Sequence, residues 1–331
     1  MNKHTELRSW IGEVFLNKDN NAFELIELSG GKNNAVFCLT DSAKTKYTIK
    51  IYNPYHTQNF NRLQSEWFFL SQAETHGIEN VPKPLFKNEK LHACIYSYEP
   101  GTKLRSNQIE PKHIQAAANF ICSINKKMTH VSFGPAADYC RSLFDHLRIV
   151  EKRVMMLNDM DMKLSNAQRA VELVNNKVIP QWKRIIDEIK SKISAAELEK
   201  NNKLFLSPSD FGFHNILWNG NTPTFLDFEY AGLDDLAKLT NDFFLCPQIK
   251  ADVKYRKIFV DIIANTLDVD SNFTDRCKLT HNIHKIKWIC IILKDFHTHG
   301  NKQRSFISKK TQETRTAEQL VKATDLINSM E

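Results

Sequence analysis

The first hundred residues alternate between short apolar runs and polar turns. Five runs short enough to be strands occur in order, at residues 23–28, 35–39, 47–52, 81–85 and 93–101. Between the third and fourth runs, apolar residues recur with the period of a helix, which predicts one helix over residues 59–73. The fifth run ends on Pro100 and Gly101, a pair typical of a hinge between two structural units. The pattern predicts a small β-rich N-terminal unit.

Most of the remaining chain carries apolar residues at helical spacing. Helical patterns cover residues 113–128, 141–200, 277–296 and 316–330. The region 141–200 contains few Gly or Pro residues, with Pro180 as the exception. Two short apolar runs, 204–206 and 216–218, interrupt the helical pattern and are typical of buried strands. A mainly helical second unit is therefore expected to contain a few short strands.

Two polar motifs follow short apolar runs in this second unit. Asp210 follows the run at 204–206, and Asn215 lies five residues further along the chain. A second acidic pair, Asp227 and Glu229, begins twelve residues beyond Asn215. Either motif alone would also suit a surface turn, because Asp and Asn favour turns for conformational reasons. Both motifs in order, each beside apolar runs, favour a site, because rigid strand ends hold side chains at fixed separations.

Phosphoryl transfer is a reaction that needs this set of side chains. It uses an Asp that accepts the proton of the attacking hydroxyl, an Asn that binds a cation, and a later Asp that bridges cations to the phosphates. The spacing of Asp210 and Asn215, followed by a strand and an Asp-Phe pair, matches the signature of protein kinases. The residue after that pair is Glu229, where protein kinases have Gly.

The stretch 226–232, Leu-Asp-Phe-Glu-Tyr-Ala-Gly, resembles the choline and ethanolamine kinases and the aminoglycoside phosphotransferases. The resemblance covers roughly residues 23–246. It implies an α+β, bilobal protein-kinase-like fold with a small β-rich N-lobe and a larger, mainly α-helical C-lobe. The implied division is an ATP-binding lobe at 1–99 and a catalytic and substrate-binding lobe at 100–331, with a helical insert at about 141–200.

The resemblance also implies a role for each motif residue. Asp210 would be the catalytic base, and Asn215 and Asp227 would bind Mg2+. Glu229 would help to bind the second cation. The implied reaction moves the γ-phosphoryl group of ATP to a hydroxyl of a small molecule, such as an amino alcohol, a sugar or an aminoglycoside-like compound.

A turn and a lysine in the N-terminal unit are candidates for nucleotide binding. The turn after the first run resembles the Gly-Gly-x-x-Asn turn of the small-molecule kinases, with candidate residues Gly30, Gly31, Asn33 and Asn34. Backbone amides in such a turn can face phosphate oxygens. Lys50 lies between Ile49 and Ile51, where a charge needs a partner or a ligand. The solvent face of an edge strand would also suit it, but the family's Lys at this place contacts the phosphates.

Two further assignments complete the expected nucleotide site. Glu66 is the only acidic residue of the predicted helix at 59–73, so it is the candidate partner that orients Lys50. In kinase-like folds the backbone of the hinge contacts the adenine edge. Ser97 and Tyr98 are therefore expected to line the nucleotide.

The chain departs from the family pattern at the catalytic loop. Pro208 occupies the position, two residues before Asp210, where these kinases have a His that supports the loop. Asp234 or Asp235 is expected to anchor the loop, with the register between them open. His214 could contact a phosphate or the substrate, or could support the loop from behind. This loop is closer to a bacterial branch of unassigned substrate than to the resistance enzymes.

Composition and charge agree with a cytoplasmic protein without a membrane span. The longest strongly apolar run, residues 288–293, falls far short of the ~20 residues that cross a bilayer. Seven cysteines without a Cys-x-x-Cys pair indicate buried, reduced thiols. The basic residues behind the net charge of +7 are spread along helices, so no nucleic-acid partner is expected. The oligomeric state stays open.

A second kind of function remains in view. A catalytically silent kinase fold could bind nucleotide and act through a protein partner. The joint presence of Lys50, Asp210 and the cation-binding pair argues against it, because a protein that only binds has no need of a base.

Overall fold

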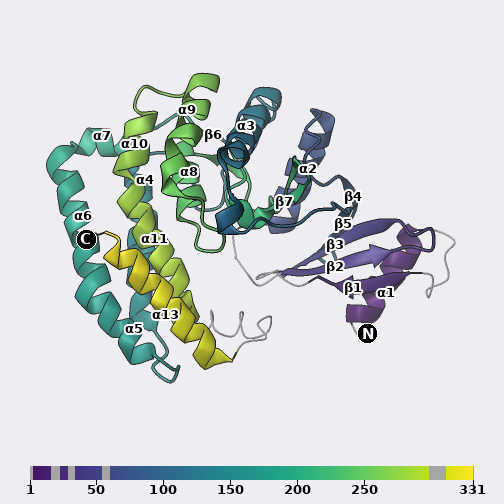
Figure 1. Ribbon diagram of the computed structural model, residues 1–331, viewed down its shortest axis with the longest axis horizontal. Helices are drawn as coiled ribbons and strands as arrows, with labels where there is room; N and C mark the ends of the chain where they lie inside the picture. The colour runs from purple at the N-terminus through teal and green to yellow at the C-terminus, as the bar shows by residue number, and fades with distance from the viewer. Residues whose placement is uncertain (1–2, 16–22, 29–33, 54–59, 298–310, 331) are drawn as a thin grey trace.

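The computed structural model describes residues 3–15, 23–28, 34–53, 60–297 and 311–330. A five-stranded antiparallel sheet forms one end of the molecule (Figure 1), with strand order β1-β2-β3-β5-β4. The strands are β1 (Glu24–Glu27), β2 (Asn34–Thr40), β3 (Lys46–Tyr52), β4 (Pro84–Asn88) and β5 (Ala93–Ser97). Helix α1 (Lys3–Val14) packs on the sheet by burying Leu7, Trp10 and Ile11. Burial of such side chains stabilises the fold by roughly 1.5–3 kcal/mol each.

Helix α2 (Arg62–Thr75) links this sheet to the rest of the molecule. It begins after Asn61, whose side chain caps the first turn by accepting a hydrogen bond from Gln64 N. Its inner face packs into the largest hydrophobic core, where the Phe69 ring stacks on Phe228 with 4.1 Å between the centroids. The helix that carries Glu66 is therefore fixed against the segment that carries Asp227 and Glu229.

The second part of the described chain is mainly helical, as predicted. Its longer helices are α3 (Pro111–Lys127), α4 (Leu143–Met156), α6 (Ile179–Lys192), α8 (Leu236–Leu245), α9 (Arg256–Thr266), α11 (His281–Leu293) and α13 (Gln312–Asn328). Its shorter helices are α5 (Ala167–Leu173), α7 (Ala195–Glu199) and α10 (Phe273–Leu279). A sheet at one end and helices over the rest confirm the predicted bilobal α+β fold.

Four short strands carry the two polar motifs. Strand β6 (Phe205–Ser207) pairs with β9 (Gly232–Asp234), and β7 (Ile216–Asn219) pairs with β8 (Thr222–Phe225), both antiparallel. The predicted strands at 204–206 and 216–218 are thus confirmed. The loop after β6 holds Asp210, and the loop after β8 holds Asp227.

Two glycines allow backbone segments to approach these strands closely. Gly101 has φ of 146°, and a Cβ there would lie 2.9 Å from the Trp218 carbonyl oxygen. Thr102 then exchanges two backbone hydrogen bonds with Trp218, at 3.0 and 2.9 Å. At Gly232 a Cβ would lie 2.5 Å from Ala136 N. Only glycine lets the hinge segment and the 134–136 segment pack against the site strands.

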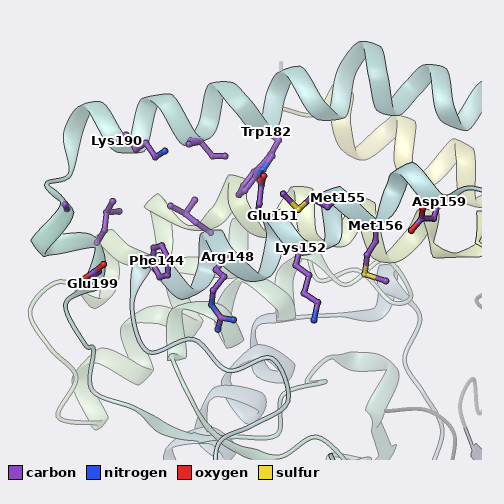
Figure 2. A pocket seen from close by; sticks show the side chains of 14 residues that line it. Phe144, Arg148, Glu151, Lys152, Met155, Met156, Asp159, Trp182, Lys190 and Glu199 are labelled. Atoms are coloured by element: carbon purple, nitrogen blue, oxygen red, sulfur yellow. The ribbon is translucent and has the colours of Figure 1, made fainter. Parts of the chain in front are cut away.

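The predicted insert at 141–200 contains α4, α5, α6 and α7. These helices share a second hydrophobic core with α11 and α13. A groove of about 850 Å3 runs between α4 and α6 (Figure 2). Its lining includes Phe144, Met155 and Trp182, whose indole nitrogen donates a hydrogen bond to Glu151. The groove lies on the helical insert, and none of the motif residues lines it.

The single helix predicted over residues 277–296 is wrong, because the structure has two helices there. The pattern over 277–296 belongs to two helices, because α10 ends at Leu279 and α11 begins at His281. Thr280 lies between them, and its hydroxyl donates to the Arg276 carbonyl oxygen at 2.8 Å. A threonine that bonds its own backbone competes with the helical hydrogen bonds. All seven cysteines are buried and free, and no described helix could cross a membrane.

Candidate active site

Lys50 of β3 lies at the centre of the site. Its Nζ is 2.6 Å from Glu66 Oε2 and 2.6 Å from Asp227 Oδ1. The lysine is only 7% exposed, which places it in the interior and not on a solvent-facing strand edge. Its neighbours raise its pKa well above the usual range, because the attraction of Asp227, Glu66 and Glu229 outweighs the opposing effect of burial. Lys50 therefore carries its positive charge next to the Asp227 loop.

Glu66 holds Lys50 from α2, as the sequence predicted. Its Oε2 also accepts a 2.5 Å hydrogen bond from the Tyr52 hydroxyl, and its Oε1 accepts one from Phe228 N at 3.2 Å. The Tyr52 hydroxyl lies 2.7 Å from that of Tyr96 on β5. Glu66 thereby joins the sheet, α2 and the loop of the second motif.

Asp227 is the most open carboxylate of this group. It follows β8 with φ of 67°, a left-handed conformation that is strained for a residue with a side chain and is found often at functional sites. Its side chain is 32% exposed, while the side chains of Glu66 and Glu229 are 5% and 2% exposed. Burial, with added repulsion from nearby carboxylates, raises the pKa of Asp227 to about 7 against the attraction of Lys50.

Glu229 is fully engaged by its neighbours. Its Oε2 accepts a 2.5 Å hydrogen bond from Asn34 Nδ2 and lies 3.3 Å from Lys50 Nζ. Its Oε1 lies 3.2 Å from Arg62 Nη1. Burial would raise the pKa of Glu229, but Lys50 and Arg62 outweigh it and hold this pKa below the usual range. The carboxylate is charged and neutralised by two cations.

Asp210 and Asn215 lie on the loop after β6, next to the Asp227 loop. Asn215 Nδ2 donates to the Asp210 carbonyl oxygen at 2.9 Å, and Leu226 N donates to the Asn215 carbonyl oxygen at 2.9 Å. The first bond holds the Asp210 loop in shape, and the second joins it to the segment that leads into Asp227. Ser209 has φ of 68°, so the backbone turns sharply just before Asp210. The structure brings Asp210, Asn215 and Asp227 onto adjoining loops.

His214 supports the carboxylate of Asp210. Its Nε2 lies 3.2 Å from Asp210 Oδ1, and its Nδ1 lies 3.3 Å from Cys246 Sγ. Burial would lower the pKa of His214, but the bond to Asp210 and the contact with Cys246 raise it to about 10. The ring is 6% exposed, so it contacts Asp210 from the protein interior.

The site offers oxygen ligands of the kind that divalent cations prefer. Carboxylate oxygens of Glu66, Asp227 and Glu229 lie within 4.8 Å of one another. All three carboxylates lie near Lys50, but the Asp227 side chain is 32% exposed, whereas those of Glu66 and Glu229 are buried. Burial is the main cause of the raised pKa of Asp227 and repulsion from the neighbouring carboxylates adds to it, so a bound cation would favour the ionised form. Among the described residues, Asp227 and the neighbouring Asn215 fit a hard cation best.

The structure does not test the other residues expected at the nucleotide. Gly30, Gly31 and Asn33 lie outside the described residues. Ser97 ends β5, and its hydroxyl donates to Glu99 Oε1 at 2.5 Å. Tyr98 follows it and packs its ring against the Lys46 ammonium group. These contacts leave the expected role of the hinge backbone untested.

The expected anchor of the catalytic loop is wrong for both candidates. The Asp234 side chain accepts hydrogen bonds from Cys140 N and Lys238. The Asp235 side chain caps α8 and binds His146 and Arg276. Both carboxylates thus turn into the helical part, although β9 pairs with β6 through the backbone.

Arg62 is the residue that sequence reasoning missed. It is 4% exposed at the first position of α2 and contacts Glu229 and Asn34. It is the only basic residue of the predicted helix at 59–73. It lies four residues, about one helical turn, before Glu66. The same elimination that selected Glu66 would have selected Arg62.

Comparison with known proteins identifies the family. A model described as the Phosphotransferase enzyme family matches residues 24–246, which is more than half of the chain. No curated protein sequence matches the chain at a significant level.

Solved structures share the fold at low sequence identity. The choline kinase from Cryptosporidium parvum Iowa II has a TM-score of 0.56 and 15% identity, covering 99% of this chain and 97% of that chain. The amicoumacin kinase hAmiN, solved with AMP-PNP, Ca2+ and Ami, has a TM-score of 0.61 and 10% identity, with 99% and 96% covered. The gentamicin-APH(2")-IIa complex has a TM-score of 0.61 and 13% identity, with 100% and 98% covered. The chain belongs to the phosphotransferase enzyme family and is a phosphotransferase.

Proposed function

We propose that this protein moves the γ-phosphoryl group of ATP, bound with Mg2+, to a hydroxyl of an amino alcohol, a sugar or an aminoglycoside-like compound. The observation that carries the proposal is the pair of adjoining loops, with Asp210 and Asn215 on one and Asp227 on the other, beside Lys50. A base, two cation ligands and a phosphate-binding lysine are the parts that phosphoryl transfer requires. The similar amicoumacin kinase was solved with the ATP analogue AMP-PNP, which supports ATP as the donor.

Each residue has a defined task in this proposal. The Asp210 carboxylate accepts the proton of the acceptor hydroxyl, while the charged His214 ring holds that carboxylate in place. Asp227 and Asn215 would hold Mg2+, and the bound cation would supply positive charge that offsets the negative charge of the phosphates. Lys50 binds the phosphates, and Glu66 keeps it oriented through the 2.6 Å ion pair. We assign the nucleotide to residues 1–99 and the acceptor to residues 100–331.

The decisive variant for this function is Asp210→Ala. Loss of a positioned general base lowers turnover by about 10²–10⁴-fold, and the Lys50 and Asp227 contacts that bind nucleotide and cation stay in place. An ATP-consumption screen over amino alcohols, sugars, nucleosides and aminoglycosides first identifies the acceptor. Calorimetric titration with Mg2+ and AMP-PNP then tests whether the variant still binds the nucleotide.

The outcomes of this experiment separate the two candidate functions. Unchanged turnover in Asp210→Ala would remove Asp210 from the role of base. A wild-type protein that binds the nucleotide tightly but consumes no ATP with any acceptor would favour the catalytically silent binding protein.

A further inference from the structure

Arg62, Asn34 and Glu229 form a closed triangle of side-chain contacts. Arg62 Nη1 lies 3.1 Å from Asn34 Oδ1 and 3.2 Å from Glu229 Oε1. Asn34 Nδ2 completes the triangle by donating a 2.5 Å hydrogen bond to Glu229 Oε2. All three residues are buried, at 4%, 9% and 1% exposure. Each polar group in the triangle therefore has a partner away from water.

The three residues come from three segments that the proposed reaction must align. Asn34 is the first residue of β2, directly after the Gly-rich turn expected at the phosphates. Arg62 opens α2, the helix that carries Glu66, and its Nη2 donates to the Asn53 carbonyl oxygen at the end of β3 at 2.6 Å. Glu229 lies two residues after Asp227. The triangle thus joins the N-terminal sheet to the loop of the proposed metal ligand.

We propose that Arg62, Asn34 and Glu229 act together as a latch that holds the start of β2, at Asn34, against the Asp227 loop for nucleotide binding. The inference rests on the proposed function. It also replaces the expected role of Glu229, which becomes a positioning residue and not a ligand of the second cation. The name Arg62 latch is used below for these three residues.

The contacts of Glu229 argue against direct cation binding. Both of its oxygens are already bonded, one to Arg62 and the other to Asn34, with Lys50 Nζ 3.3 Å away. A divalent cation bound there would lie beside two positive side chains and would be repelled by both. Asp227 contacts one cation, Lys50, and retains an exposed side chain. Metal and latch therefore use different carboxylates.

Geometry also distinguishes the latch from a simple stabilising ion pair. A buried ion pair contributes little net stability relative to apolar packing, because desolvation offsets the attraction between the charges. The Arg62 guanidinium donates hydrogen bonds to partners from both sides of the site, which fixes the relative position of those partners. The forked guanidinium makes this possible, since it donates in several fixed directions at once.

The test is the variant Arg62→Met, which keeps the length of the side chain and removes its charge and donors. A hydrogen bond to a charged group contributes enough that its loss should raise the Kd for Mg2+ and AMP-PNP about tenfold or more. The KM for ATP should rise in proportion, with kcat and the KM for the acceptor changed less than about threefold. Arg148→Met, at an exposed arginine on α4 in the groove, is the matched control and should leave all four values unchanged.

A second pair of variants separates positioning from metal binding. Glu229→Gln should weaken nucleotide binding as Arg62→Met does, yet leave the Mg2+ concentration for half-maximal activity unchanged. Asp227→Asn should raise that Mg2+ concentration. If circular dichroism shows that Arg62→Met does not fold, Asn34→Ala replaces it as the test variant, because it removes a neutral partner from the latch. It should raise the nucleotide Kd in the same direction.

Three outcomes would overturn the latch. One is a folded Arg62→Met or Asn34→Ala protein with wild-type nucleotide affinity. Another is a Glu229→Gln protein that needs more Mg2+, as Asp227→Asn does. A third is an Arg62→Met protein whose kcat falls while its KM for ATP stays unchanged. A wild-type protein that binds no nucleotide would instead contradict the proposed function itself, so the two failures are distinguishable.

Discussion

Two clusters of buried charge in this protein differ in how completely their carboxylates are paired. In the active-site cluster, Asp227 contacts Lys50 and keeps a side chain that is 32% exposed. In the helical part, Asp235 is 0% exposed and accepts hydrogen bonds from His146, Arg276 and Asn202. The first carboxylate has room for a ligand, and the second has none.

The pKa values of the two carboxylates move in opposite directions because their neighbours differ. Burial raises the pKa of each. At Asp227 the neighbouring carboxylates add to that effect and the pKa reaches about 7. At Asp235 the bonds from His146 and Arg276 outweigh burial and lower the pKa to about 2. Asp235, with all its partners in place, is therefore a structural charge, and Asp227 is the candidate for binding a cation.

The largest expected effect is on activity at the open cluster. Asp227→Asn should lower turnover about 10³-fold or more, because the metal loses the carboxylate that holds it and several kcal/mol of charge stabilisation are lost. Thermal stability at neutral pH should not fall, because the neutral side chain removes the cost of a buried charge beside Glu66 and Glu229. Steady-state kinetics measure the turnover, and a thermal melt measures the stability. A variant with wild-type turnover would contradict the proposed role of Asp227 in the reaction.

The next effect is on stability at the saturated cluster. Asp235→Asn should lower the free energy of unfolding by about 3 kcal/mol, because Arg276 and His146 lose their buried anion. Urea unfolding measures the change, and nucleotide affinity of the folded protein should stay the same. Asp261→Asn, in an exposed pair with Lys257 on α9, is the control and should unfold like the wild type. An Asp235→Asn protein of unchanged stability that fails to bind nucleotide would reverse the assignment.

The smallest effect is the pH dependence that Asp227 imposes. Its folded pKa of about 7 exceeds its ordinary value of 3.8, so the folded state binds a proton there that the unfolded state releases. The resulting stability is present below pH 3.8 and is lost as the pH rises to about 7. Mg2+ affinity should rise over the same range, because the cation needs the ionised carboxylate. In Asp227→Asn, stability and Mg2+ affinity should no longer change with pH over this range. If either pH dependence persists, it belongs to another group.

Local patterns in the sequence predicted the elements and the contacts that depend on few partners. Apolar runs bounded by turns predicted five strands in the observed order, although β4 lies at 84–88 and not at the predicted 81–85. A lysine between two isoleucines predicted that Lys50 needs a partner, and it is buried beside two carboxylates. The single acidic residue on the following helix predicted the Lys50–Glu66 pair. Each of these rests on one element or on two consecutive elements.

Contacts between segments far apart in the sequence could not be predicted in the same way. The orientation of Asp235 depends on His146 and Arg276, which come from α4 and α10. The pairing of Arg62 with Glu229 joins residues 167 positions apart. Asp234 and Asp235 both suit the sequence motif, and only the positions of their partners in the folded chain decide where each side chain points.

Soaking crystals with Mn2+ and AMP-PNP, followed by anomalous difference maps, tests the central contrast most directly. The account predicts a Mn2+ peak coordinated by oxygens of Asp227 and Asn215, at about the 2.0–2.1 Å typical of small octahedral cations. It predicts no peak at Asp235. A peak coordinated by Glu229 and Glu66 would contradict it, as would bound nucleotide with no metal at Asp227.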